Sequence, residues 1–538
     1  MINKNDEFIL DITEFSGEGN GIGHHNNMVV FVNGAIKGDT VLCHIIKSKK
    51  NYCIGIIKAF VNKSSLRIES DCEISNKCGG CIYKNIPYKE ELKIKSNEVY
   101  QCIKRIGKYD ILPQNIIYGK RNNYRNKASL PVTQNYTFGF YANKTHKIIE
   151  NKNLSCNISS NIFNKILKDI SLFLKNNNIS VYNEETNNGL LKHVVLRYAQ
   201  KTNQIMVIFA VKNNRFENLK NIADFITNKH KEIKSIYINV NSQKTNVILG
   251  EKNIKIFGED FITDELCNLK FNISPLSFYQ VNRDMAEKLY FKVKEYADVL
   301  NKTVLDLYCG TGTIGLSLAK EAKKVYGIEI VNQAIENAKQ NAKLNNITNA
   351  EFFCDDAVNI DKYITEQIDT VILDPPRKGT DKKITDYIAA VIKPSVIVYV
   401  SCDSATLARD LTYFKENNYI LKEYTPVDMF PCTKHVETVV QLVRKKPDTY
   451  IDITVDMDEL DLTSSEAKAT YDEIKDYIFD KYRVKVSSLY IAQVKQKHGI
   501  IERDCYNNSK KDNQKQPQCP PEKVKLIEEA LRHFKMIS

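Results

Sequence analysis

The sequence lacks any run of eighteen apolar residues, so no transmembrane helix and no membrane partner are expected. Its first residues, MINKND, are not a basic region followed by an apolar core, which excludes a secretory signal. The 14 cysteines are too few and too unevenly spaced for a disulfide scaffold in a chain of 538 residues. These absences favour a reduced, cytoplasmic protein.

The composition is that of a globular chain, with 43% hydrophobic and 26% charged residues, which excludes a disordered or fibrous protein. The formal net charge is +12, and its distribution is uneven. Residues 448–480 carry eleven acids against two lysines, whereas residues 481–538 carry thirteen basic residues against six acids. Residues 448–538 thus have a net charge of −2, and the residues before them have a net charge of +14. This basic body fits either a nucleic-acid partner or ordinary surface solvation.

The organisation predicts a multi-domain protein. Residues 1–60 alternate short apolar strands with glycine-rich turns, typical of a small OB-like β-barrel, a fold that often binds oligonucleotides. Residues 61–272 form a mixed α/β central domain that starts with a cysteine-rich patch, and a segment near 84–120 is expected to pack on the catalytic domain. Residues 273–445 alternate strand and helix like a doubly wound, Rossmann-like sheet. Residues 446–538 are a helical appendage. The expected tail helices lie near Thr463–Tyr482, Lys485–His498 and Pro521–Phe534.

A glycine loop follows a buried strand at residues 304–316, which read VLDLYCGTGTIGL. Its glycines Gly310, Gly312 and Gly315 fit the dinucleotide pattern G-x-G-x-x-G. Asp306 argues against a pyrophosphate there and for a cationic ligand such as S-adenosylmethionine. Glu329, near the end of the next strand, can accept both hydrogen bonds of a ribose diol. Asp356, after the strand that follows, is placed to meet an adenine amino group.

Asp374 ends a further buried strand and is followed by two prolines and Arg377. Ligands of open α/β sheets bind beyond such strand ends, although the pattern also fits a strand-terminating turn. Amino-group methyltransferases usually place an aromatic residue after the two prolines. Arg377 therefore points away from an amine substrate.

Cys402 lies at the end of the buried strand 396–401 and is either a nucleophile or an inert buried cysteine. Asp403 beside it opposes thiolate formation, so the activating group must come from elsewhere. His435 and Glu437, near the same sheet end, either supply a base or form a capped turn.

These residues fit one reaction. Carbon 5 of uracil is a poor nucleophile, but a thiolate that adds to carbon 6 makes it reactive toward a sulfonium methyl group. A base then removes the proton of carbon 5, and the thiolate leaves. Cys402, Glu437, Asp374 and the glycine loop provide the groups that this scheme needs.

The chain resembles the bacterial 23S ribosomal RNA (uracil-C5)-methyltransferases of the RlmD/RumA and RlmCD type. The resemblance spans about residues 1–445 and includes DPPRKG at 374–379, SCDSATLARD at 401–410, HVE at 435–437 and FYQVN at 278–282. It implies that residues 1–60 are a TRAM domain. It also implies a flipped target uridine in 23S ribosomal RNA.

By the same resemblance Cys402 is the nucleophile and Glu437 the proton acceptor. Phe278 would stack on the target base, and Gln280 and Asp374 would contact it. The resemblance implies that the S-adenosylmethionine site includes Gln280, Tyr308, Glu329, Asp374 and Asp356, beside Asp306, Gly310 and Gly312 of the loop.

Three cysteines within ten residues, Cys72, Cys78 and Cys81, form a candidate metal site with Cys156 as the fourth thiol. The spacing suits zinc and an iron–sulfur cluster equally. The resemblance implies a [4Fe–4S] cluster, and because tRNA-directed relatives generally lack one, it favours ribosomal RNA.

Two other enzyme functions remain open, a nucleic-acid amino-methyltransferase and a tRNA uracil-C5 methyltransferase. A non-catalytic RNA-binding module is the third alternative, which the intact set of acids and Cys402 disfavours. A monomer is expected, and the sequence assigns no function to the appendage.

Overall fold

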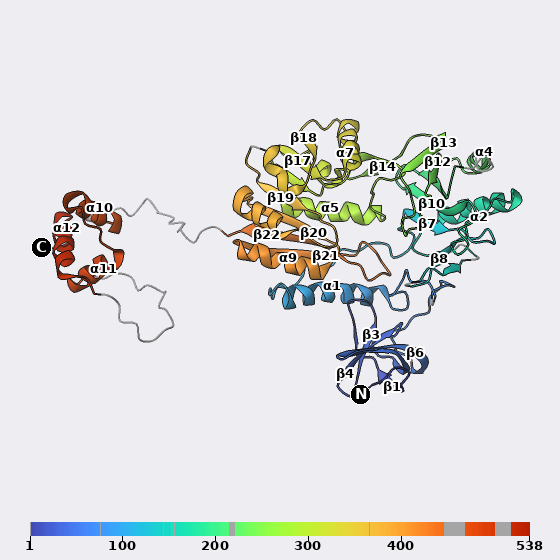
Figure 1. Ribbon diagram of the computed structural model, residues 1–538, viewed down its shortest axis with the longest axis horizontal. Coiled ribbons are helices and arrows are strands. Elements are labelled where there is room, and N and C mark those ends of the chain that lie inside the picture. The colour runs from blue at the N-terminus through green and yellow to red at the C-terminus, as the bar shows by residue number, and fades with distance from the viewer. Residues whose placement is uncertain are drawn as a thin grey trace, which may run out of the picture. The chain divides into compact units, whose positions relative to one another are not determined.

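The computed structural model describes residues 2–75, 77–143, 145–151, 153, 156–214, 221–364, 366–445, 469–500 and 518–537. The chain divides into two compact units, residues 1–447 and 448–538 (Figure 1). Within the described ranges, no helix is both long and apolar enough to cross a membrane.

The N-terminal six-stranded sheet has the order β1-β5-β6-β4-β3-β2. Its strands are β1 (Glu7–Asp11), β2 (Glu14–Phe15), β3 (Gly21–His25), β4 (Met28–Asn33), β5 (Thr40–Ser48) and β6 (Tyr52–Asn62). Alternate residues such as Val30, Val32 and Val41 are buried, as the period of two in a half-buried strand requires. A Cβ at Gly55 would lie 2.2 Å from Sγ of Cys43, so β5 and β6 approach closely only because this residue is glycine.

Helix α1 (Tyr88–Arg105) follows and packs along α9 (Ser404–Glu416), as Figure 1 shows. Val99 and Ile103 bury the apolar part of its inner face. Glu91 and Lys95 are also buried, one turn apart on the same helix. Charged side chains are almost never fully buried unless they are paired, so this part of the helix needs partners elsewhere in the chain.

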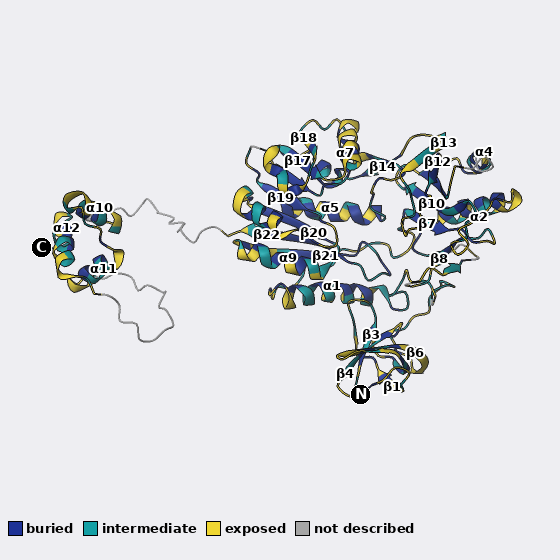
Figure 2. Cartoon of the chain, in the orientation of Figure 1, coloured by how far each residue is buried: buried dark blue, intermediate teal, exposed yellow. Residues whose placement is uncertain are grey.

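The central domain is built on a five-stranded sheet with the order β13-β12-β11-β10-β7. Its strands are β7 (Lys127–Pro131), β10 (Leu191–Ala199), β11 (Gln204–Val211), β12 (Ile233–Val240) and β13 (Lys252–Gly258). Helices α2 (Asn161–Asn176) and α4 (Ile222–Lys229) cover one face, and the ribbon β8 (Gly139–Tyr141) and β9 (Ile148–Glu150) flanks it. Residues of the other face pack into the core of the catalytic domain, so both faces are buried (Figure 2).

The catalytic sheet has seven strands in the order β18-β17-β16-β19-β20-β22-β21. They are β16 (Thr303–Leu307), β17 (Lys324–Glu329), β18 (Ala350–Cys354), β19 (Thr370–Leu373), β20 (Val396–Ser401), β21 (Tyr419–Val427) and β22 (Glu437–Arg444). β22 runs antiparallel to both of its neighbours, β20 and β21. The strand order reverses between β16 and β19, and ligands bind at such a point beyond the carboxyl ends of the strands.

Helices cover this sheet on both faces. They are α5 (Arg283–Ala297), α6 (Thr313–Leu318), α7 (Asn332–Leu344), η1 (Ala357–Lys362), α8 (Lys382–Tyr387), η2 (Ile388–Ile392) and α9 (Ser404–Glu416). The hairpin β14 (Ile262–Leu266) and β15 (Leu269–Ile273) precedes α5. The inner parallel strands β16, β19 and β20 are buried on both faces, as their continuous apolar runs predict, whereas the edge strand β18 is partly exposed.

The second unit contains α10 (Tyr471–Tyr482), α11 (Ser488–Lys497) and α12 (Pro521–His533) around a small apolar core. Thr470 begins α10 with a reciprocal capping box to Glu473. The expected helix near 463–482 therefore starts at residue 471, and its first residues, 463–468, lie outside the described ranges. Most of the polar segment predicted at 507–518 also lies outside them.

Candidate active site

The glycine loop connects β16 to α6, and the carboxyl group of Asp306 lies beneath it. Oδ2 of Asp306 accepts the N–H of Gly315 at 2.9 Å, whereas Oδ1 is buried and has no hydrogen-bond partner. Burial raises the pKa of Asp306 to about 8, and the carboxylates of Asp374 and Glu329 contribute. An unpartnered buried oxygen is costly, and a ligand that brings positive charge to the loop would relieve that cost.

The loop backbone adopts conformations that favour glycine. Gly310 has φ +54° and Gly312 φ +76°, and a Cβ at Gly312 would lie 3.0 Å from the Phe352 ring. At Gly310 nothing lies within 4 Å of the Cβ position, so a ligand has room to approach the backbone. Glu329 accepts the N–H of Gly310 at 3.3 Å, which places its carboxylate at the loop. Tyr308, with φ 63°, is a half-buried non-glycine residue in the left-handed region.

The acids after β18 have different environments. Asp355 accepts hydrogen bonds from Asn359, Tyr363 and the backbone of Asp356, which lower its pKa. Asp356 is exposed and caps the following 3₁₀ turn through the N–H of Val358 at 3.1 Å. Asp356 is thus accessible to a ligand, and the assignment of adenine recognition to it stays a prediction.

The strand register brings Cys402 and Glu437 together. Ser401 of β20 pairs with Thr438 of the antiparallel strand β22, so Cys402 and Glu437 each stand one residue beyond the same pair. Leu373 of β19 pairs with Tyr399 of β20, which brings Asp374 to the same edge. Three side chains from distant parts of the chain therefore converge on one end of the sheet.

The charges at this edge of the sheet influence one another. Burial raises the pKa of Cys402 to about 11; the negative charges of Glu437 and Asp374 add to the shift, and Arg377 opposes it. Burial raises the pKa of Glu437 to about 8, again with Asp374 adding and Arg377 opposing. Burial raises the pKa of Asp374 to about 7. Arg377, an exposed residue of the segment after β19, is thus a cation whose charge favours the ionised forms of Cys402 and Glu437.

His435 belongs to the loop before β22 and lies beside Arg377. Its ring lies 3.4 Å from a guanidinium nitrogen of Arg377, and burial lowers its pKa to about 4. An imidazole with so low a pKa is a weak base, whereas Glu437, with its pKa raised to about 8, is the stronger proton acceptor and the better candidate for the base.

Phe278 and Gln280 belong to the segment before α5. Phe278 is 69% exposed, so it is not part of the core and its ring is free to stack on a ligand. Asn126 donates to the carbonyl of Gln280 at 3.0 Å, and Asn282 caps α5 through the N–H of Met285. This segment is thus fixed at both ends.

The four candidate metal ligands line one cavity of about 370 Å³. Cys72, Cys78, Cys81 and Cys156 all border it, and so do Lys84 and Arg121. Cys432, which the sequence analysis did not assign to this site, borders it as a fifth thiol. Across the described ranges, no three His, Cys, Asp or Glu side chains have the arrangement of a site for a metal ion.

The raised pKa values predict how stability depends on pH. Asp306, Asp374 and Glu437 have folded pKa values near 7 or 8, above the values of about 4 in unfolded chains. The contribution of these three carboxyl groups to the free energy of unfolding is fully present below their unfolded pKa values. It is lost as the pH rises through their folded pKa values. We expect the free energy of unfolding of the ligand-free protein to fall between pH 5 and pH 8. Each such carboxyl contributes a slope of about 1.4 kcal/mol per pH unit.

Urea unfolding at a series of pH values measures that slope. Glu437→Gln, which keeps the shape and cannot ionise, should make the slope shallower, whereas Glu14→Gln on an exposed strand residue should not. A stability that rises from pH 5 to pH 8, or equal slopes in both variants, would contradict the burial of these protonated acids.

Comparison with known proteins places this arrangement in a family. The profile described as tRNA (Uracil-5-)-methyltransferase matches residues 87–367, that of a methyltransferase domain matches 299–438, and that of the TRAM domain matches 4–58. An uncharacterized RNA methyltransferase of Clostridium tetani is 42% identical over 448 residues, covering 82% of this chain and 96% of that protein. A second, of Clostridium acetobutylicum, is 43% identical over 454 residues, covering 82% and 98%.

A solved structure agrees with these sequence relatives. The tRNA (uracil-54, C5)-methyltransferase of Pyrococcus abyssi, determined in complex with S-adenosyl-L-homocysteine, has a TM-score of 0.67. It is 29% identical and covers 81% of this chain and 99% of its own. The resemblance inferred from the motifs is confirmed: the chain belongs to the tRNA (uracil-5-)-methyltransferase family of RNA methyltransferases, with a TRAM domain at its N-terminus.

Proposed function

We propose that the protein transfers a methyl group from S-adenosylmethionine to carbon 5 of a uridine in 23S ribosomal RNA. The observation that carries this proposal is the register of β20 and β22, which places the thiol of Cys402 beside the carboxyl of Glu437. A uracil ring between them would meet a nucleophile for carbon 6 and a proton acceptor for carbon 5.

The donor site fits S-adenosylmethionine. Asp306 offers a buried oxygen without a partner, Gly310 leaves open space, and Glu329 presents a carboxylate at the loop for a ribose diol. Gln280, Tyr308 and the other donor-site residues named above complete the proposed site. When bound, S-adenosylmethionine supplies an electrophilic methyl group on a sulfonium centre.

The residues of the chain divide the reaction among them. The Cys402 thiolate adds to carbon 6, and carbon 5 then takes the methyl group. Glu437, as carboxylate, removes the proton of carbon 5, the bond from carbon 6 to sulfur breaks, and the thiolate is restored. Arg377 favours the charged forms of both groups. Phe278 stacks on the base that leaves its helix, and Asp374 and Gln280 contact it.

We propose that Cys72, Cys78, Cys81 and Cys156, which line one cavity, hold a [4Fe–4S] cluster, with zinc as the alternative. Four thiols around one space are the donor set that either group requires. Such a group would act as a rigid cross-link between the cysteine loop and the central domain and takes no part in methyl transfer. Assays for iron, acid-labile sulfide and zinc in protein purified without oxygen distinguish the two.

Methylation of purified RNA tests the function. Incubation with labelled donor and unmodified 23S ribosomal RNA or tRNA should place the label on carbon 5 of a uridine in the ribosomal RNA. Because the solved relative is a tRNA (uracil-54, C5)-methyltransferase, tRNA is the second candidate substrate. Label in tRNA alone would reject the ribosomal substrate, and an N-methylated product would reject the reaction.

A further inference from the structure

The loop between β21 and β22, residues 428–436, ends one residue before Glu437. Four of its consecutive carbonyl groups each accept a hydrogen bond from another part of the chain. The donors are Asn282 Nδ2 to Met429 at 2.9 Å, Lys95 Nζ to Phe430 at 3.1 Å, the Tyr124 hydroxyl to Pro431 at 3.0 Å, and the N–H groups of Ile82 and Tyr83 to Cys432 at 2.9 and 3.0 Å. Hydrogen bonds from four separate segments of the chain therefore fix the backbone of this loop.

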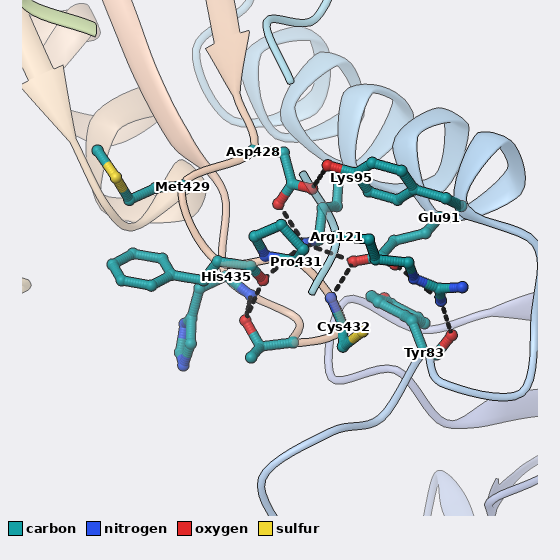
Figure 3. Close-up of polar contacts among 12 residues, drawn as sticks. Tyr83, Glu91, Lys95, Arg121, Asp428, Met429, Pro431, Cys432 and His435 are labelled. Atoms are coloured by element: carbon teal, nitrogen blue, oxygen red, sulfur yellow. Dashed lines mark hydrogen bonds and ion pairs between the residues drawn. The ribbon is translucent and has the colours of Figure 1, made fainter. Parts of the chain in front are cut away.

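Four charged side chains, three of them buried and Arg121 partly exposed, meet at the start of this loop (Figure 3). Nζ of Lys95 lies 2.6 Å from Asp428 and 3.0 Å from Glu91, and all three side chains are at most 1% exposed. Arg121 pairs with the other oxygen of Glu91 at 3.1 Å, and the hydroxyl of Tyr88 donates to Asp428 at 2.7 Å. Two cations face two carboxylates, so the set is balanced in charge and linked by hydrogen bonds.

Cys432 shows how tightly the loop is held. Its φ is 68°, in the left-handed region that L residues rarely adopt. Its N–H donates to Glu91 at 2.6 Å, and its carbonyl accepts the N–H groups of Ile82 and Tyr83, directly after the cysteine ligand Cys81. Such a conformation persists only where the surroundings fix it, and these bonds do so from α1 and from the cysteine loop.

The same bonds extend toward the base. The carbonyl of Phe430, which Lys95 binds, also accepts the N–H and the hydroxyl of Thr433 at 3.1 and 2.8 Å. Oγ1 of Thr433 in turn accepts the N–H of His435 at 3.2 Å, and His435 stands two residues before Glu437. Cys402 directly follows β20 and is not part of this loop. Hydrogen bonds therefore connect Lys95 through the loop to the neighbourhood of Glu437, the proposed base. Cys402, the proposed nucleophile, takes no part in these bonds.

We propose that Lys95 is a positioning residue for Glu437. From α1, its ammonium group fixes the start of the loop and thereby sets where the Glu437 carboxylate meets the proton of carbon 5. The proposal rests on the proposed role of Glu437 as the proton acceptor. It assigns to α1 an effect on one step, removal of the proton, and none on the binding of RNA or of the methyl donor.

Two substitutions test it. Lys95→Met removes the ammonium group and keeps the length of the side chain, but it leaves two buried carboxylates with one cation, so the variant risks failing to fold. Tyr124→Phe is milder, since it removes only the hydroxyl bond to the carbonyl of Pro431. Tyr419→Phe is the matched control, because this buried tyrosine donates to the carbonyl of Pro394, away from the loop, at 2.7 Å.

We expect kcat to fall about ten-fold in Tyr124→Phe and about hundred-fold in Lys95→Met, as for small displacements of a catalytic group. KM for RNA and for S-adenosylmethionine should stay within about two-fold. With RNA carrying deuterium at carbon 5, the isotope effect on turnover should rise, because proton removal becomes slower relative to the other steps. Tyr419→Phe should match the wild type in all of these measurements.

The proposal is overturned if Tyr124→Phe behaves like Tyr419→Phe, or if kcat falls in either test variant without a larger isotope effect. Glu437→Gln, measured in parallel, separates this result from the function itself. If Glu437→Gln blocks proton removal and Tyr124→Phe does not slow it, only the positioning role is wrong. If Glu437→Gln leaves proton removal intact, the assignment of the base is wrong.

Discussion

Replacing Cys402 with alanine is expected to lower the rate of uridine methylation by at least about three orders of magnitude. Without the thiolate, carbon 5 of uracil is too weak a nucleophile to attack the methyl group. The loss should appear in kcat, since Cys402 forms its bond only after RNA and donor are bound. Single-turnover methylation of 23S ribosomal RNA measures it, and donor binding by calorimetry should be unchanged.

Cys102→Ala is the matched control. Cys102 of α1 is also half-buried, and burial likewise raises its pKa, to about 12, but it lies outside the strand ends that carry the reacting groups. This variant should retain nearly full activity. A Cys402→Ala enzyme that methylates within about ten-fold of the wild type would eliminate the covalent route.

Replacing Glu437 with glutamine should trap the enzyme on its RNA. The amide keeps the size of the carboxyl group but cannot accept the proton of carbon 5, so the bond between sulfur and carbon 6 cannot break. Turnover should fall by about 10² to 10⁴. A methylated protein–RNA adduct should appear as a slow band on a denaturing gel.

Two further variants serve as controls for the adduct. Glu423→Gln on β21, the partner strand of β22, should turn over normally and form no lasting adduct. The double variant Cys402→Ala with Glu437→Gln should form none either, because it lacks the sulfur. RNA binding without any adduct in Glu437→Gln alone would remove Glu437 from the role of base.

Much of the fold followed from local patterns. Buried apolar runs predicted the catalytic strands, and the glycine loop predicted the turn from β16 to α6. The partnership of Cys402 with Glu437 did not follow, because it depends on β22 running antiparallel between β20 and β21. That insertion is a property of the tertiary packing; the sequence suggested the pair only through the reaction scheme and the family resemblance.

Charged residues were the hardest to interpret from sequence. Lys95 and Glu91 occur in a helix rich in lysine and glutamate, where charges normally face solvent, yet both are buried. Their partner Asp428 lies more than three hundred residues away, so no local pattern signals it. From the sequence, Arg377 showed only that no aromatic residue follows the two prolines. In the structure, its positive charge lowers the pKa of the Cys402 thiol.

Because β22 is antiparallel to β21, the length of the loop between them, residues 428–436, sets where Glu437 lies relative to Cys402. Side chains alternate along a strand, so a slip of β22 by two residues would keep every side chain on its present face. The same slip would carry Glu437 about 6.8 Å along the sheet and away from Cys402. A deletion of two residues between 428 and 436 would move Glu437 away from Cys402 and would also break bonds that hold the loop to Lys95 and Tyr124, so catalysis and packing together fix the length of this loop.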